Sequence, residues 1–320
     1  MTERRALITG AGGQDGTYLA ESLLADGYEV VGVIRDTGRR RHHLGGVRVV
    51  EVDLLDQAAV AGLLEEHRPA EVYNLAAPSF VPRSWEHPLE TATLGTVGVT
   101  ALLEAVRAVD DAIRVFQASS SEIFGDPAEV PQTEGTPLAP VTPYGVAKAY
   151  GHFIVGAYRR RYGLHASAGI LYNHESPRRP ESFLPSKVAH GAARIARGTG
   201  HELVLGDLDA QRDWGYAKDF VEGMRAMLRQ DEPDDYVIAT GELHSVRELV
   251  ELAFAHVGLD WREHVKVDES LQRGRTERHR VVGDASKARA RLGWSPTVTF
   301  AELVALLVDA AVSGSGAGRA

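Results

Sequence analysis

The sequence predicts an α/β protein, built as a doubly wound parallel sheet with a smaller C-terminal domain. Three observations lead to this fold class. Short apolar runs alternate with helical segments through the first half of the chain, a glycine-rich turn follows the first run, and near Ser182 the pattern changes to helices with isolated strands. Strands separated by single helices pair in parallel, and helices then cover both faces of the sheet.

The expected elements follow one another in a regular order. The first strand covers residues 6–8, and the next segment is a helix with Leu19, Leu23 and Leu24 on one face. Gly27 ends this helix at a position where a positive φ is often needed. Later strands are expected at residues 30–34, 47–52, 72–76, 113–118 and 236–239, and helices at 57–66 and 88–109.

The same pattern divides the chain into domains. The larger domain is expected to cover residues 1–181, and later segments at about 206–245 return to its sheet. Most of residues 182–313 would form the smaller domain. Residues 314–320 are small apart from one arginine and are expected to form a flexible tail.

Composition argues against several classes of function. The chain has 320 residues and a net charge of −9, whereas a nucleic-acid or anionic-membrane surface needs an excess of Lys and Arg. Cysteine is absent from the sequence, which removes disulfides and thiolate catalysis, and no metal is expected. We find no signal peptide and no stretch near the roughly 20 apolar residues of a membrane span. The expected location is the cytoplasm.

A glycine-rich turn joins the first strand to the first helix. Gly10, Gly13 and Gly16 are spaced three residues apart in this turn. Glycines here let the backbone approach a pyrophosphate, which then lies at the positive end of the helix. Such a motif can also be a plain turn, but the strand before it and the helix after it favour a dinucleotide cofactor.

The end of the second strand should distinguish NADP from NAD. An acid there would bind the ribose 2′-hydroxyl of NAD, but Ile34 takes that position and Arg35 follows it. The guanidinium group of Arg35 suits the 2′-phosphate of NADP, so NADP is the expected cofactor. Asp36 is either a displaced acid, which keeps NAD as the alternative, or a turn residue. Asp53, at the end of the third strand, is expected to accept a hydrogen bond from adenine.

Tyr144 and Lys148 are four residues apart, so they share one face of a helix. A nearby ammonium lowers the pKa of a tyrosine, and the phenolate could then take a proton from a sugar hydroxyl. Ser120 and Glu122 follow the strand at 113–118, at the carboxyl edge where α/β sheets place ligands. These four side chains form a candidate proton-transfer set, although Glu122 could instead cap a turn.

Taken together, these features resemble the extended short-chain dehydrogenases. Longer segments resemble the GDP-mannose 4,6-dehydratase family in particular, among them Asn173-His-Glu-Ser-Pro-Arg-Arg179 and Arg212-Asp-Trp-Gly215. The resemblance covers residues 4–312 and includes the segments 13–16, 117–122, 169–179, 206–215 and 234–242. It implies a Rossmann domain, a C-terminal substrate-binding domain, and a reaction that oxidises C4 of a nucleotide sugar, eliminates water across C5 and C6, and returns the hydride to C6.

The resemblance also implies roles for individual residues. Ser120 would bind the C4 oxygen, where the family has Thr, and Glu122 would remove the proton at C5. Tyr144 would be the base at O4, while Lys148 would hold both Tyr144 and the nicotinamide ribose. The implied cofactor ligands are Gly10, Gly13, Gln14, Asp15, Gly16, Arg35, Asp53, Leu54, Leu75, Ala76, Tyr144, Lys148 and His174. The implied substrate ligands are Ser79, Ser121, Asn173, Lys187, Arg212, Arg275 and Glu277.

Departures from the family leave alternatives open. The loop after the second strand is shorter than in the family, the segment 183–187 has lost an arginine, and in 274–277 an arginine has moved. GDP-mannose is the expected substrate, with another GDP-sugar such as a heptose as the alternative. Other readings are an epimerase or decarboxylase on this scaffold, or a cofactor-sensing regulator without turnover. A homodimer through the helices after Pro88 and Pro143 is what the family suggests, with a tetramer as the alternative.

Overall fold

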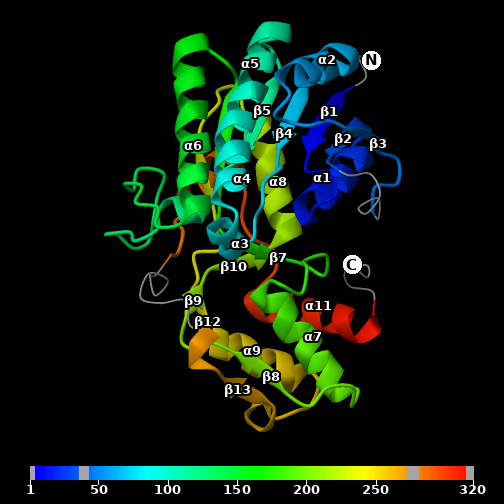
Figure 1. The fold of residues 1–320 in the computed structure, drawn as a ribbon, viewed down its shortest axis with the longest axis vertical. Helices are drawn as coiled ribbons and strands as arrows, with labels where there is room; N and C mark the ends of the chain where they lie inside the picture. The colour runs from blue at the N-terminus through cyan, green and yellow to red at the C-terminus, as the bar shows by residue number, and fades with distance from the viewer. Residues whose placement is uncertain (1–3, 36–42, 272–280, 315–320) are drawn as a thin grey trace.

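The computed structural model describes residues 4–35, 43–271 and 281–314, and these residues form two lobes (Figure 1). The larger one, called here the sheet lobe, is built on a parallel sheet in the order β11-β6-β5-β4-β1-β2-β3. Its strands are β1 (Arg5–Thr9), β2 (Glu29–Ile34), β3 (Arg48–Glu51), β4 (Glu71–Asn74), β5 (Arg114–Ala118), β6 (Ala166–Leu171) and β11 (Tyr236–Ile238). The predicted doubly wound fold class is confirmed.

Helices cover both faces of the sheet and bury all of its strands except the edge strand β3, which is partly exposed. On β1, Ala6 and Ile8 pack toward one face and Leu7 toward the other. The first face is covered by α1 (Gln14–Ala25), α8 (Ala217–Leu228) and α10 (Ser286–Leu292). The second is covered by α2 (Gln57–His67), α5 (Val99–Val109) and α6 (Pro143–Tyr162).

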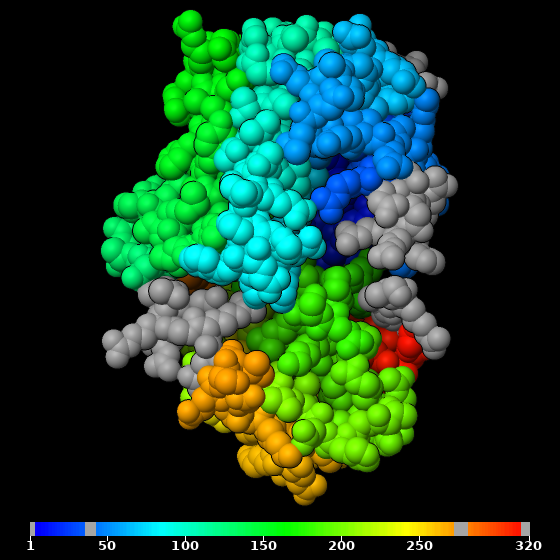
Figure 2. Space-filling view, viewed as in Figure 1, coloured from blue at the N-terminus to red at the C-terminus, as the bar shows by residue number. Residues whose placement is uncertain are grey.

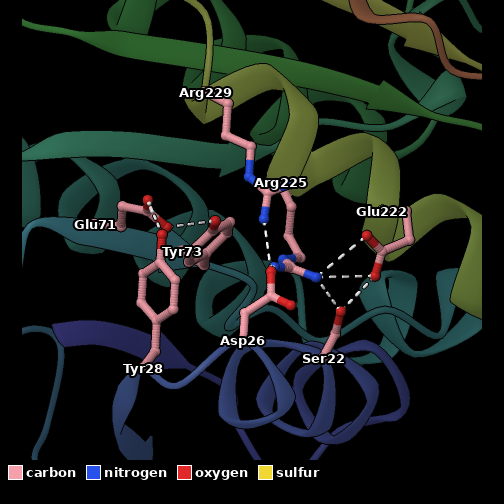
Figure 3. A network of polar contacts seen from close by, with 8 residues as sticks. All are labelled: Ser22, Asp26, Tyr28, Glu71, Tyr73, Glu222, Arg225 and Arg229. Carbon is pink, nitrogen blue, oxygen red and sulfur yellow. Dashed lines mark hydrogen bonds and ion pairs between the residues drawn. The ribbon is translucent and has the colours of Figure 1, made fainter. Parts of the chain in front are cut away.

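Polar contacts centred on the buried Arg225 hold α8 against α1 (Figure 3). Arg225 of α8 is 4% exposed and donates to Asp26 and Ser22 at the end of α1, while Glu222 accepts from both Arg225 and Ser22. Arg229 donates to the same Asp26 carboxylate at 2.9 Å. In the same view, Glu71 accepts hydrogen bonds from the hydroxyls of Tyr28 and Tyr73 at 2.9 and 2.8 Å.

The second lobe, called here the small lobe, has its own apolar core. This core joins α7 (Leu184–Ala196), α9 (Val246–His256) and α11 (Phe300–Ser313), with Trp214 stacked on Phe300 at 5.7 Å. Two-stranded pairs complete the fold: β8 (Leu203–Leu205) with β13 (Val265–Val267), β9 (Gln211–Arg212) with β12 (His244–Ser245), and β7 (Asn173–Glu175) with β10 (Trp214–Tyr216). β11 and α8 return to the sheet lobe, and the domain boundaries proposed from the sequence stay predictions.

The segment 88–109 differs from its prediction in two ways. It is divided into α4 (Pro88–Thr93), a π-helical turn (Leu94–Gly98) and α5, where one continuous helix was expected. The expectation that no stretch approaches a membrane span was also wrong, because Pro88–Val109 is long and apolar enough by length and composition. The core on the sheet face covered by α2, α5 and α6 includes four residues of α5: Val99, Leu102, Leu103 and Val106. Packing against the sheet therefore explains the apolar character of α5.

Candidate active site

The glycine turn after β1 leaves a backbone cradle. Gly10 has φ +69°, and a Cβ atom there would lie 3.0 Å from Ala76 N and Cα. A Cβ at Gly16 would lie 2.5 Å from the carbonyl oxygen of Gly10, which no side chain could tolerate. Gly13 caps the N-terminus of α1 with extended backbone. This arrangement fits the pyrophosphate of a dinucleotide, because bare backbone and a helix N-terminus face the same space.

A buried hydroxyl holds the neighbouring loop against this cradle. The Oγ1 atom of Thr9 accepts from the backbone N–H groups of Leu75 and Ala76, both at 3.2 Å. It donates in turn to Asn74 Oδ1 at 2.6 Å. The structure therefore brings Leu75 and Ala76, both predicted cofactor ligands, beside Gly10.

Asp15 and His174 form a pair, although 159 residues separate them in the chain. His174 Nε2 lies 3.0 Å from Asp15 Oδ2, and the imidazole ring stacks on Phe220. Gln14 Nε2 donates to the His174 carbonyl at 3.1 Å, which fixes β7 against the start of α1. Burial would raise the pKa of Asp15, but the charge of His174 and its hydrogen bond lower that pKa to about 2. Burial would lower the pKa of His174, but Asp15 raises it.

Strand β2 ends at Ile34, followed by Arg35, the two residues predicted to distinguish NADP from NAD. Ile34 is buried, whereas the Arg35 side chain is 76% exposed and donates to Glu90 of α4 at 3.1 Å. Asp53 is exposed and its Oδ1 atom accepts from the N–H of Leu55, while Leu54 is half-buried. Asp36, the alternative acid, lies outside the described residues.

The proposed catalytic residues come from two elements that meet at the carboxyl edge. Strand β5 ends at Ala118, and Ser120 then caps a 3-10 turn by accepting from the N–H of Glu122 at 3.3 Å. Ser120 is thus the N-cap of this turn. Tyr144 lies in the first turn of α6, which Thr142 caps and Pro143 begins. Lys148, one turn further on, donates from Nζ to the Ala118 carbonyl at 2.7 Å.

The acid–base properties of this group differ from the prediction. Burial raises the pKa of Tyr144 to about 12; the hydrogen bond with Ser120 works in the lowering direction, and the charge of Glu122 raises the value further. The expectation that Lys148 lowers the Tyr144 pKa was wrong for this arrangement, because Lys148 Nζ bonds to Ala118 and lies 5.6 Å from the centre of the tyrosine ring. Burial also lowers the pKa of Lys148 to about 8.

A small hollow lies beside the predicted catalytic pair, lined by Tyr144, Lys148, Gln117, Ala76 and Thr91 among others. The sequence analysis did not single out Gln117. Its Oε1 atom accepts from Asn74 Nδ2 at 2.7 Å, and its Nε2 atom donates to the Ala118 carbonyl that also receives Lys148. A hydrogen-bonded line thus crosses the strand ends from Thr9 to Lys148. The sequence signal for this line of hydrogen bonds was an amide side chain near the end of each of two strands, Asn74 and Gln117.

Arg179 and Glu175 form a second contact near the site to which the sequence had assigned no individual role. Glu175 is 3% exposed and its Oε2 atom lies 3.4 Å from Arg179 Nε, while the guanidinium group stacks on Phe183 at 3.6 Å. Phe183 contacts Phe80 of the loop after β4 edge to face. Burial raises the pKa of Glu175, and Arg179 opposes that rise. The sequence signal that could have pointed to this pair is an arginine placed shortly after the strand that carries His174.

The predicted substrate ligands are spread over both lobes. Ser79 is exposed in the loop after β4, and Ser121 is buried in the 3-10 turn beside Ser120. Asn173 pairs with Trp214 across β7 and β10. Lys187 Nζ donates to the Val204 carbonyl at 2.8 Å, and Arg212 Nη1 donates to the Gln211 carbonyl at 2.7 Å. Arg275 and Glu277 lie outside the described residues.

A parallel sheet with a glycine cradle, and a Ser, Tyr and Lys at its carboxyl edge, defines an extended short-chain dehydrogenase/reductase. Residues 7–307 match the family described as GDP-mannose 4,6 dehydratase, and the chain belongs to that family. It is 46% identical to GDP-mannose 4,6 dehydratase 1 of Arabidopsis thaliana, over 95% of this chain and 88% of that protein. It is 44% identical to the human GDP-mannose 4,6 dehydratase, over 96% of this chain and 91% of the relative.

Solved structures agree on the fold. The UDP-glucose 4-epimerase of Thermus thermophilus, in complex with NAD, superposes with a TM-score of 0.84 at 29% identity, covering 96% of this chain and 98% of the other. The predicted family and fold are therefore confirmed. The roles of individual site residues stay predictions.

Proposed function

We propose that this protein is a GDP-mannose 4,6-dehydratase that yields GDP-4-keto-6-deoxymannose. One observation carries the proposal: Ser120, Glu122, Tyr144 and Lys148 come together at the sheet edge beside a dinucleotide cradle, in a chain of this family. A simple hydride-transfer enzyme needs one acid–base group, whereas elimination of water beside a ketone needs a second. Glu122 supplies the second group.

The cofactor is proposed to be NADP, with NAD as the alternative. A bound nicotinamide dinucleotide would take a hydride from C4 and return it at C6. The cradle formed by Gly10 and Gly16 would hold its pyrophosphate, and Arg35 would bind the 2′-phosphate. The NAD complex of the Thermus thermophilus neighbour supports a nicotinamide cofactor without choosing between the two.

The chain's own residues would divide the proton transfers. Tyr144 would exchange a proton with the sugar O4, held by its hydrogen bond with Ser120. Lys148, fixed to the Ala118 carbonyl, would keep the ribose and Tyr144 in register. Glu122 would remove the C5 proton and deliver a proton to the departing C6 hydroxyl, so that water leaves with its atoms balanced.

Mass analysis of products from a panel of nucleoside-diphosphate hexoses tests the proposal. A product lighter than GDP-mannose by one water, formed without net consumption of cofactor, is the expected result. An isobaric product would instead indicate an epimerase, and loss of carbon dioxide a decarboxylase. If none of the hexoses gives a product, the remaining hypothesis is a cofactor-sensing regulator without turnover.

The proposed assembly is a homodimer, with a tetramer as the alternative. Large apolar side chains stand exposed on the outer surface of α4 and α6: Leu89 is 82% exposed and Phe153 62%, with Val97 and Val146 nearby. The cyan surface of α4 and α5 adjoins the green surface of α6 in Figure 2. Exposed apolar groups concentrated on adjoining helices favour an interface. A cytoplasmic location remains part of the proposal.

A further inference from the structure

Two arginines from different elements converge on one carboxylate at the end of β2. Arg35 Nη1 lies 3.1 Å from Glu90 Oε1, and Arg83 Nη2 lies 3.4 Å from Glu90 Oε2. Arg83 belongs to α3 (Val81–Glu86), while Glu90 is in the first turn of α4. The hydrogen bond from Arg35, together with the charge of Arg83, lowers the pKa of Glu90 although partial burial opposes this. Each oxygen of the carboxylate therefore faces a different guanidinium group.

This cluster lies next to the cofactor cradle. The backbone N–H groups of Gly10 and Ala11 donate to the Val33 carbonyl at 3.0 and 3.3 Å, so the glycine turn is bonded directly to the end of β2. Arg35 follows two residues after Val33, at the edge where a bound dinucleotide places its adenosine ribose. Ile34 between them is buried and offers no polar group.

Charge determines what this arrangement does to a ligand. A 2′-phosphate carries close to two negative charges and matches two guanidinium groups, each of which can bond to it through two N–H donors. To bind there, it must take Arg35 and Arg83 from Glu90, whose carboxylate then stands nearby as a like charge. A ribose 2′-hydroxyl meets no such opposition and can itself donate to a carboxylate.

We propose that Glu90 and Arg83 are specificity-determining residues, which together with Arg35 set the balance between NADP and NAD. Arg83 supplies the second cation for the 2′-phosphate. Glu90 competes with that phosphate for both arginines and so narrows the preference for NADP. This inference rests on the proposed nicotinamide cofactor and assigns the selection to α3 and α4 as well as to β2.

Binding titrations, which need no turnover, test the proposal. The Kd values of NADP and NAD are measured by calorimetry for the wild type and for Glu90→Gln, Arg83→Gln and the control Glu86→Gln, an exposed carboxylate at the end of α3. Glu90→Gln is expected to tighten NADP binding roughly 3- to 10-fold and to leave NAD unchanged or slightly weaker. Arg83→Gln should weaken NADP about tenfold and spare NAD, and the control should change neither.

Two further measurements separate this inference from its alternatives. In an Arg35→Gln background, Glu90→Gln should have much less effect, because the shared partner is gone. Raising the salt concentration should shrink the effect of Glu90→Gln, since the charges are partly exposed. An unchanged or lowered NADP-to-NAD affinity ratio in Glu90→Gln, in protein that melts like the wild type, overturns the role of Glu90. An unchanged ratio in Arg83→Gln overturns that of Arg83. A wild type that binds neither dinucleotide overturns the proposed function as well.

Discussion

The carboxyl edge of the sheet and the small lobe hold their predicted site residues in different ways. At the edge, Ser120 and Lys148 are tied to the ends of β5 and α6 by a turn cap and by the bond to Ala118, so their positions follow from the fold. In the small lobe, the side chains of Lys187 and Arg212 donate hydrogen bonds to the backbone carbonyls of Val204 and Gln211. The predicted catalytic residues are therefore held in place by the fold, whereas Lys187 and Arg212 would have to give up these contacts if they bind the nucleotide as predicted.

The largest effect should come from the edge itself. Tyr144→Phe is expected to reduce turnover by roughly 10²- to 10⁴-fold, the contribution of a positioned acid–base group, with cofactor affinity nearly unchanged. Lys148→Met should reduce turnover and cofactor affinity together, because it also loses the ribose contact. Product formation and cofactor titration are measured side by side. Activity above a tenth of wild type in Tyr144→Phe would remove Tyr144 as the base.

Glu122→Gln should separate two steps at the same edge. Without the carboxylate, loss of the C5 proton is blocked by roughly 10²-fold, while some oxidation at C4 continues. Reduced-cofactor absorbance should therefore rise as the 4-keto-6-deoxy product fails to appear. Glu129→Gln, an exposed carboxylate in the following loop, is the control. Wild-type product rates in Glu122→Gln would favour an epimerase.

The Asp15–His174 pair should make stability depend on pH. Since the Asp15 pKa is lowered to about 2, its contribution is present above the ordinary value near 3.8 and is lost as the pH falls toward 2. The raised pKa of His174 gives a contribution that is full below its ordinary value of 6.5 and is lost as the pH rises through the raised value.

Asp15→Asn should therefore cost on the order of 2 kcal/mol of unfolding free energy near pH 5.5, and less near pH 9. Urea denaturation at both values measures the difference. Equal losses at the two values would show that the histidine charge takes no part in the pair.

The smallest effects should lie on the nucleotide side. GDP is expected to compete with substrate at least about tenfold better than UDP or dTDP, a difference of about 1.4 kcal/mol. Arg212→Gln should weaken all three diphosphates alike, because its guanidinium group would bind the part that they share. Inhibition constants for the three nucleotides check both points. Better competition by UDP or dTDP would exclude a GDP-sugar but leave the dehydratase chemistry standing.

The same contrast explains what could be predicted from sequence. Strands 30–34 and 113–118 agree with β2 and β5 to within a residue, because apolar runs bounded by turns mark buried parallel strands. Tyr144 and Lys148 lie in α6, one turn apart, as their spacing predicted, and their catalytic roles stay predictions. The π-helical turn at Leu94–Gly98 was not predicted; it contains Gly95, which packs so closely on Ala147 that a Cβ would lie 2.7 Å away, a tertiary contact that no local pattern states.

Side-chain contacts between distant elements also could not be predicted from the sequence. The pairing of Glu90 with Arg35 and Arg83 joins three elements, and no local pattern specifies it. The pKa of Tyr144 was misjudged because a sequence states neither the burial that raises it nor the bond that directs Lys148 to the Ala118 carbonyl.

The contacts between α1 and α8 also bear on how the chain is made on the ribosome. Ser22 and Asp26 find their partners in Glu222 and Arg225, about 200 residues later. Strand β6 likewise waits for β11 as its outer neighbour. While the nascent chain is shorter than this, one side of α1 and the edge of β6 stay uncovered, although every other strand of the sheet has been synthesised. An unpaired edge of this kind invites association with other chains, so translation of residues 172–235, between β6 and β11, is the interval in which a chaperone would be needed most.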